Sequence, residues 1–327
     1  MAMLQLSKLK FAVPVEAQAQ KYVDTLDIDQ AAHRLYMGDN WSGGVDVFDI
    51  SSPTPTYLKT IRTRGNLFGV AVAKEVDKVF VGLANSFVGV IDIAAGSPTE
   101  DTFVARVDTN GNGAADLIDW DPVHRKLYVA NRHAVNGVDD GFISAIDGVT
   151  NEVVARIEHL GRTLEQPRFN PTDGFVYVTG AGDNVLHQID PATDRLIATF
   201  PIGDDCHPNG LAINPTTNQA LFACNNRDRN HTVIWDLTTQ AVASVIEECG
   251  AGDGAIYDPI ANKYLFAASG FRDGPVMGVF DGTTAALIAT VPTERGASWA
   301  AYDQTHNVVY APAYEDGKPA LLSFAMP

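Results

Sequence analysis

The sequence has few charged residues and no long apolar run. Charged residues make up 19% of its 327 residues, below the roughly 25% usual in a globular protein, while apolar residues make up 46%. This composition excludes intrinsic disorder and supplies enough apolar material for a large core. No apolar run approaches the roughly 18 residues that span a membrane as a helix, so we expect no membrane partner.

Positive charge is especially scarce. The chain has 23 Lys and Arg residues against 40 Asp and Glu residues, which gives a net charge of −17. Without a basic cluster, a chain this acidic repels nucleic-acid phosphates and anionic lipids. We therefore expect no nucleic-acid partner. The expected partner is a small-molecule substrate, with a protein partner as the alternative.

Cysteine is rare as well. The three cysteines are Cys206, Cys224 and Cys249, and none belongs to a Cys-x-x-Cys motif. Because an odd number cannot all pair, we predict free thiols in a reducing compartment, and hence a cytoplasmic protein. Lys8, Lys10 and Glu16 interrupt any apolar segment near the start, so no signal peptide is expected. A secreted or periplasmic location is expected only if such a peptide has been removed.

No stretch has apolar residues at a sustained helical spacing. The sequence instead contains a repeated unit. Each unit has an apolar run, a Pro or polar turn, a second run, and a third run that ends in Asp before a Thr-rich turn. Residues 117–131 and 143–150, for example, read LIDWDPVHRKLYVAN and ISAIDGVT. The aspartates that end the third runs are Asp49, Asp92, Asp147, Asp190, Asp236 and Asp281. A seventh copy, 299–325, has Ala325 in that place.

The runs have the composition of short β-strands. They are rich in Val, Ile, Phe and Tyr and are bounded by Gly, Pro, Asn and Asp. Seven such units of about 45 residues predict an all-β, seven-bladed β-propeller that occupies residues 1–327 as a single domain. The last copy ends after its third strand. We predict that residues 9–15 (LKFAVPV) supply the missing outer strand and close the ring.

The repeats resemble those of the YVTN family of β-propellers. The resemblance covers about residues 20–325 and implies the propeller fold. It implies little about function, because that family includes enzymes, cofactor-binding proteins and interaction scaffolds. The motifs that carry it are LYVAN (127–131), VYVTG (176–180), LFACN (221–225) and the ID-x-x-T endings at 146–150 and 189–193.

The first strand of each blade lines the central channel of a propeller. Aligning the copies on the turn after this strand places one residue of each copy at the strand entrance. These seven residues are Asp24, Phe68, Asp116, Glu165, Asn209, Asp253 and Ser298. Four carboxylates around one axis repel each other, which raises their pKa values unless a cation lies among them. Water filling the channel is the plain alternative to a functional site.

An oxygen-rich ring suits one hard divalent cation, Ca²⁺, Mg²⁺ or Mn²⁺ rather than Zn²⁺. The predicted metal ligands are Asp24, Asp116, Glu165, Asn209 and Asp253. Protonation of some carboxyl groups would relieve the same repulsion, and would provide the unequal pairs used in acid–base catalysis.

Two further resemblances concern activity. Asn209-Gly210 and Asp253-Gly254 look like motifs of the SMP-30/gluconolactonase propellers, which hold one axial divalent cation and hydrolyse lactones or related esters. That resemblance implies Glu165, Asn209 and Asp253 as ligands. The family is six-bladed and orders its ligands differently, however, whereas this chain has seven units. A resemblance to virginiamycin lyase-like propellers implies that elimination is an equal alternative to hydrolysis.

Other candidate residues surround the ring in sequence. His207 lies two residues before Asn209, where a strand residue would face the channel, so it is a candidate general base or a turn residue. The predicted catalytic residues are thus His207, Glu165 and Asp253. Arg132 and Arg227 are expected to bind a substrate carboxylate or phosphate, or else to pair with the ring acids. The remaining predicted substrate contacts are Asn66, Phe68, Trp299 and Tyr314.

One motif competes with the ring. Residues 108–119 (DTNGNGAADLID) match the opening of a calcium-binding loop, although they lack its usual Glu and flanking helices. The ordinary interpretation is a turn between blades. Together the observations predict a metal-dependent lactonase- or esterase-like hydrolase, or a lyase, with its site at the channel mouth. The alternative is a non-catalytic scaffold that binds a protein or small ligand on its loop face.

Overall fold

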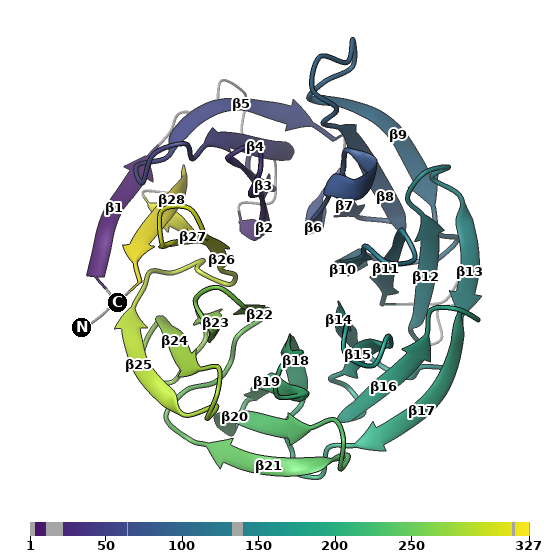
Figure 1. Cartoon of the computed structure of the whole chain (residues 1–327), viewed down its shortest axis with the longest axis vertical. Coiled ribbons are helices and arrows are strands. Elements are labelled where there is room, and N and C mark those ends of the chain that lie inside the picture. The colour runs from purple at the N-terminus through teal and green to yellow at the C-terminus, as the bar shows by residue number, and fades with distance from the viewer. Residues whose placement is uncertain (1–3, 11–21, 64, 133–139, 316–317, 327) are drawn as a thin grey trace.

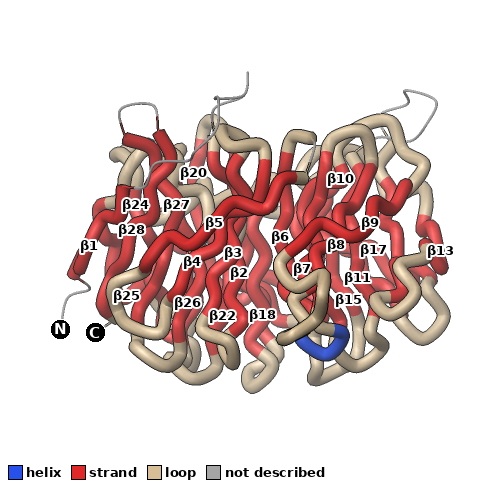
Figure 2. The backbone as a smooth tube through the Cα atoms, turned by 90° about the horizontal axis from the view of Figure 1, so that it is seen from above, coloured by secondary structure: helices blue, strands red, loops and turns tan. Residues whose placement is uncertain are grey.

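A computed structural model of the chain describes residues 4–10, 22–63, 65–132, 140–315 and 318–326. These residues form seven four-stranded antiparallel sheets arranged around one axis, as Figure 1 shows. Seen from the side in Figure 2, the strands form a short cylinder with loops at both ends. The predicted all-β, seven-bladed propeller is confirmed. No helix in the described part of the chain is long and apolar enough to cross a membrane.

The first four blades follow the chain from the inside outward. The first contains β2 (Val23–Asp29), β3 (Arg34–Asp39), β4 (Gly44–Asp49) and β5 (Thr56–Arg62). The second contains β6 (Leu67–Ala73), the 3-10 helix η1 (Lys74–Val76), β7 (Lys78–Leu83), β8 (Phe87–Asp92) and β9 (Thr102–Asp108). The third contains β10 (Ala115–Asp121), β11 (Lys126–Asn131), β12 (Phe142–Asp147) and β13 (Val153–Ile157). The fourth contains β14 (Leu164–Phe169), β15 (Val176–Gly180), β16 (Val185–Asp190) and β17 (Arg195–Pro201).

The last three blades complete the ring. The fifth contains β18 (Pro208–Asn214), β19 (Gln219–Asn226), β20 (Arg229–Asp236) and β21 (Ala241–Ile246). The sixth contains β22 (Ala255–Asp258), β23 (Lys263–Ala268), β24 (Val276–Asp281) and β25 (Leu287–Pro292). The seventh contains β26 (Ala301–Asp303), β27 (Val308–Glu315) and β28 (Lys318–Ala325), with β1 (Leu4–Lys10) as its outer strand.

The N-terminal strand closes the ring, but it begins earlier than predicted. β1 pairs antiparallel with β28, with Leu4 opposite Ala325 and Lys10 opposite Ala320. It lies beside the yellow C-terminal strand in Figure 1. Only residues 9 and 10 of the predicted segment belong to it, and residues 11–15 lie outside the described part of the chain. The predicted segment contains Pro14, which has no N–H to donate to a strand ladder, whereas residues 4–10 contain no proline.

The core lies between adjacent blades. Alternate residues of a strand face opposite sides of its sheet, so each blade packs against both of its neighbours. In β11, Val129 belongs to the apolar cluster that includes Val90 of the second blade. The preceding residue, Tyr128, belongs to the cluster that includes Val178 of the fourth blade. The apolar residues of the repeated motifs are therefore core residues.

The aspartate that ends each third strand organises the following turn. In the third blade, Asp147 Oδ1 accepts hydrogen bonds of 2.8 Å from the N–H groups of both Val149 and Thr150. These bonds, the one from Thr150 above all, hold the pKa of Asp147 below its usual range. The equivalent residues Asp236 and Asp281 accept the same pair of turn N–H groups.

We expect Asp147→Ala to lower the free energy of unfolding by about 1 kcal/mol at pH 7, because two turn N–H groups lose a charged acceptor. A carboxyl group with a lowered folded pKa stabilises the protein above its ordinary pKa, and that contribution disappears as the pH falls. The difference between variant and wild type, measured by urea unfolding, should therefore shrink below pH 4. Asp147→Asn keeps an acceptor oxygen and should recover most of the loss. An equal loss at every pH would contradict this role.

Candidate functional site

The seven residues predicted to form a ring do lie together. Asp24, Phe68, Asp116, Glu165, Asn209, Asp253 and Ser298 all line one cavity of about 360 Å³ on the propeller axis. Three further side chains, Tyr22, Arg132 and Tyr314, complete most of the wall. We call this space the axial cavity. Its ring arises because every inner strand begins at the same end of the cylinder.

The four carboxyl groups of the axial cavity differ in exposure. Asp116 and Glu165 are buried, with 3% and 5% of their surfaces exposed, and Asp24 is half-buried. Asp253 is exposed and faces the open space of the cavity. Burial raises the pKa of each of the four above its usual range. Repulsion from Asp116 raises the pKa values of Asp24, Glu165 and Asp253 further.

Arg132 is the cation of this cavity. Its Nε forms a charged hydrogen bond with Asp116, and its Nη2 lies 3.6 Å from Glu165 Oε1. The arrangement matches the alternative in which this arginine pairs with the ring acids. Its side chain is still 41% exposed, so part of the guanidinium faces the cavity. The charge balance among the lining residues is thus four carboxyl groups to one guanidinium.

The remaining wall mixes one amide with aromatic rings. Arg132, and to a smaller extent the amide of Asn209, offset part of the rise in the pKa of Asp253 that burial causes. Tyr22, Phe68 and Tyr314 supply apolar surface. The hydroxyl of Tyr314 is buried and has no hydrogen-bond partner among the described residues.

As they lie, the carboxyl groups do not form a ready-made metal site. Nowhere in the axial cavity do three carboxyl groups bring oxygen atoms within 4.8 Å of one another. Among the described residues, the group of ligand-type side chains that does lie so close is Cys206, Cys224 and His231. Arg132 moreover supplies positive charge where a metal ion would. The divalent cation therefore stays a prediction.

His207 lies outside the axial cavity, in a neighbouring one. This second cavity, of about 490 Å³, is lined by Thr163, Ala181, Gly182, His207, Asn209, Asn225, Asn226 and Arg227. His207 precedes β18 and has a left-handed backbone (φ 48°), so the alternation of side chains along a strand does not extend to it. Its Nδ1 lies 2.8 Å from the carbonyl oxygen of Ala181, and its Nε2 lies 3.2 Å from Asp205 Oδ1.

Two of the predicted substrate contacts also lie away from the axial cavity. Asn66 precedes β6 and does not line it; its carbonyl oxygen accepts a hydrogen bond from Ala84 N–H. Trp299 lines a third cavity, of about 330 Å³, at the far end of the inner strands. Trp299 follows Ser298 directly, and neighbouring residues point in different directions along an extended chain. These two residues are therefore not part of the axial cavity wall.

Sequence reasoning missed two side chains, Arg168 and Gln166, that join the inner strands of different blades. Arg168 donates to the carbonyl oxygens of Leu211 and Ala255 at 3.1 and 3.0 Å, and to Asp119 at 2.6 Å. Gln166 also bonds both backbones, with its Oε1 2.7 Å from Leu211 N and 2.9 Å from Ala255 N. These bonds join blades three to six between the axial cavity and the third cavity, which share no lining residue.

The calcium-loop interpretation does not agree with the environment of its last ligand. Asp119 lies inside β10, where one oxygen binds Arg168 and the other accepts the N–H of Phe169 at 2.9 Å. Burial raises the pKa of Asp119 and its hydrogen-bonding partners oppose that rise. The carboxylate is occupied by protein donors, so residues 109–114 form a connection between β9 and β10, as the ordinary interpretation predicts.

The prediction of three free thiols was wrong. Cys206 and Cys224 form a disulfide, with both residues fully buried, and Cys249 is the free, buried thiol. The hairpin of β18 and β19 explains the pairing, because it places Pro208 opposite Cys224 and so brings Cys206 close. The strand register of this hairpin is the observation that predicts the disulfide. Disulfides form in oxidising compartments. The predicted cytoplasmic location was based on free thiols, so that prediction is no longer supported by the cysteines.

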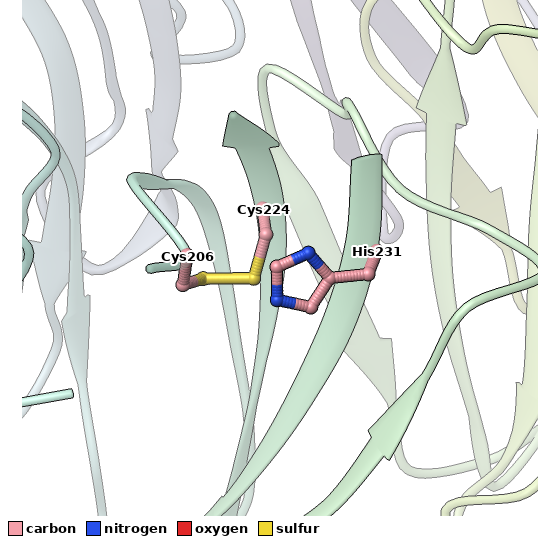
Figure 3. A group of neighbouring side chains, drawn as sticks. All are labelled: Cys206, Cys224 and His231. Carbon is pink, nitrogen blue, oxygen red and sulfur yellow. A yellow bond between two sulfur atoms is a disulfide. The ribbon is translucent and has the colours of Figure 1, made fainter. Parts of the chain in front are cut away.

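His231 packs beside the disulfide, as Figure 3 shows. Its ring is buried, with Nδ1 3.0 Å from the carbonyl oxygen of Arg229 and Nε2 2.9 Å from Asp204 Oδ2. Because both sulfurs are bonded to each other, neither is a thiolate ligand, and the group is not a metal site in this state.

Comparisons with known proteins bear on the fold alone. The chain matches no protein-family model and no curated protein. Among solved structures it is similar to hydrazine synthase from Kuenenia stuttgartiensis, with a TM-score of 0.75 over 95% of this chain and 98% of that one. The two sequences are 15% identical, so the similarity supports a shared propeller architecture and carries no activity across.

Proposed function

We propose that the protein is a small-molecule enzyme of the hydrolase or lyase class, that its axial cavity is the active site, and that its substrate carries a positive charge there. The observation that carries this proposal is the charge imbalance of the cavity, four carboxyl groups against the single guanidinium of Arg132. A bound cation would relieve the repulsion that helps to raise the pKa values of these groups.

The shape of the cavity favours an organic cation over a bare ion. Its volume of about 360 Å³ lies within the range of small-molecule sites. Tyr22, Phe68 and Tyr314 line it, and aromatic faces attract ammonium groups. A divalent metal ion instead needs several oxygens around one point, and no three of these carboxyl groups have oxygens within 4.8 Å of one another.

Two carboxyl groups have environments suited to opposite roles in proton transfer. Glu165 is buried and its pKa is raised well above the usual range, which favours the protonated form that can donate a proton to a leaving group. Asp253 is the most exposed of the four carboxyl groups, and Arg132 and Asn209 both oppose the rise in its pKa that burial causes. It is the candidate base for a substrate proton or a water.

The finer sequence predictions compete with this proposal. In the metal-dependent alternative, the same cavity holds a divalent cation on the axis and catalyses a lactonase-like reaction. We also propose that the repeats belong to the YVTN family. Nothing favours the scaffold alternative at the channel mouth, because the exposed large apolar side chains of the described residues lie in outer strands and in turns at the opposite end.

Isothermal titration calorimetry with simple probes tests the proposal. The two probes are butylamine and butanol, which have carbon chains of equal length but differ in charge. Butylamine, the cation, should bind the wild type, and butanol should not. Asp253→Asn should weaken butylamine binding by about tenfold, because it removes a carboxyl group that faces the cavity. Asp273→Asn removes an acidic group that is 77% exposed and lies outside the cavity, so it should change nothing.

The same titrations discriminate between the alternatives. Equal heats from butylamine and butanol would overturn the proposal of a cationic substrate. Calcium, magnesium or manganese chloride that binds the wild type, when butylamine does not, would establish the metal-dependent version instead. If amine-bearing esters or lactones are hydrolysed, Glu165→Gln should lower the rate about 100-fold, the usual effect of removing a general acid.

A further inference from the structure

The cavity next to the axial cavity has the opposite electrostatic character. It is lined by His207 and Arg227 and contains no carboxyl group in its wall. Asn209 lines both cavities, so the two spaces meet at one side chain. In a chain with a net charge of −17, a cavity lined by basic and neutral residues beside an acidic one is a specific arrangement.

Arg227 is available to bind an anion. It is exposed in the turn between β19 and β20, and no described carboxylate lies within 4.0 Å of its guanidinium. Arg229, two residues later, shows the contrast, because Asp204 and Glu247 already bind it. Since no side-chain partner of Arg227 is found in the described part of the chain, its planar set of N–H donors can face a carboxylate or phosphate.

The surroundings of Arg227 fix its neighbours in place. The Nδ1 of His207 is held by the carbonyl oxygen of Ala181, and the disulfide anchors the adjacent Cys206 to β19. The acidic residue nearest to His207 is Asp205, 3.2 Å from Nε2, whose side chain is 76% exposed and is not part of the cavity wall. Asn226 Nδ2 binds Asp205 Oδ2 at 2.7 Å, which keeps that carboxylate away from Arg227.

We propose that the substrate is dipolar, with a cationic group in the axial cavity and an anionic group, a carboxylate or phosphate, bound by Arg227. This rests on the proposed function, and it narrows the substrate class to amino acids and related amino-alkyl anions. Asn209 lies at the junction, where its amide contacts the part of the substrate between the two charges. The bond that reacts would then lie close to Asp253, which lines the axial cavity together with Asn209.

Pairs of probes that differ by one anionic group test this inference by calorimetry. The amines are methylamine, propylamine and pentylamine, and their partners are glycine, 4-aminobutyrate and 6-aminohexanoate; 3-aminopropylphosphonate serves as the phosphate-like arm. At the chain length that spans both cavities, the anionic group should tighten binding by about tenfold, the usual effect of a charged hydrogen-bonding pair. Arg227→Gln should remove this gain and leave the binding of the amines unchanged.

Arg229→Gln is the matched control, because it removes the same charge two residues away but outside the cavity. A gain that disappears equally in both variants would overturn the inference, since it would reflect general attraction rather than a subsite. Amines and amino acids that bind with equal affinity at every length would also overturn it, and would leave the proposed function standing. Failure of every amine and every amino acid to bind would overturn both. A gain for the phosphonate alone would identify the anion as phosphate-like and support the subsite.

Discussion

Replacing Arg132 by Gln is expected to destabilise the protein strongly at pH 8 and only weakly at pH 5. The guanidinium lowers the pKa values of Asp116, Glu165 and Asp24, which burial raises. A carboxyl group whose folded pKa is raised destabilises the fold as the pH rises above its ordinary value. Without Arg132 these pKa values rise further, so the loss grows with pH. We expect a loss of about 2 kcal/mol at pH 8, below the usual cost of breaking a buried pair because the arginine is 41% exposed.

Urea unfolding at the two pH values measures this effect. Arg162→Gln provides the control, because Arg162 is paired with Asp183 on the surface and is 57% exposed. Its effect should be small at both pH values. Combining Arg132→Gln with Asp116→Asn should restore part of the stability at pH 8, since one of the repelling carboxyl groups is then absent. A loss that is the same at pH 5 and pH 8 would show that Arg132 acts through packing rather than charge.

Removing the disulfide should have the largest effect on stability of the changes that lie outside the axial cavity. Cys206 and Cys224 are separated by 18 residues, and closing a loop of that length stabilises a fold by about 3 kcal/mol. The double variant Cys206→Ala and Cys224→Ala should therefore unfold at a markedly lower urea concentration. The loop before β18 carries His207, which lines the second cavity, so the binding of the amino acid that spans both cavities should weaken as well.

A reducing agent separates the role of the bond from that of the side chains. Dithiothreitol should destabilise the wild type and leave the double variant unchanged. Cys249→Ala removes the free thiol and should keep the full sensitivity to the reducing agent. Peptide mapping without reduction should recover residues 206 and 224 in one linked species. Two alkylated, unlinked cysteines in the protein isolated under non-reducing conditions would contradict the disulfide.

The axial ring could be predicted because it depends only on backbone repetition. In every unit the ring residue lies six residues before the same position of the inner turn, so counting back from that turn reaches equivalent positions. Asp24, Glu165 and Asp253 therefore line one cavity although 88 or more residues separate each from the next. The turn aspartates are predictable for the same reason, since Asp147 and its equivalents bind N–H groups only two and three residues away.

The rest depends on side chains that reach between units, which a repeat does not specify. Arg168 binds backbone carbonyls of two other blades, and no spacing along the chain indicates which ones. His207 leaves the expected direction because its own backbone is left-handed just before the strand begins. The disulfide was missed because counting three cysteines says nothing of geometry, whereas the hairpin register does.

The pairing of β1 with β28 has a consequence for how the chain is made. Leu4 lies opposite Ala325, so β1 leaves the ribosome long before its partner strand β28 has been synthesised. At about 5–20 residues per second, that delay is on the order of tens of seconds. During this time β1 is an unpaired strand that can add to another sheet edge. Slower translation or crowded polysomes should thus favour exchange of β1 between nascent chains.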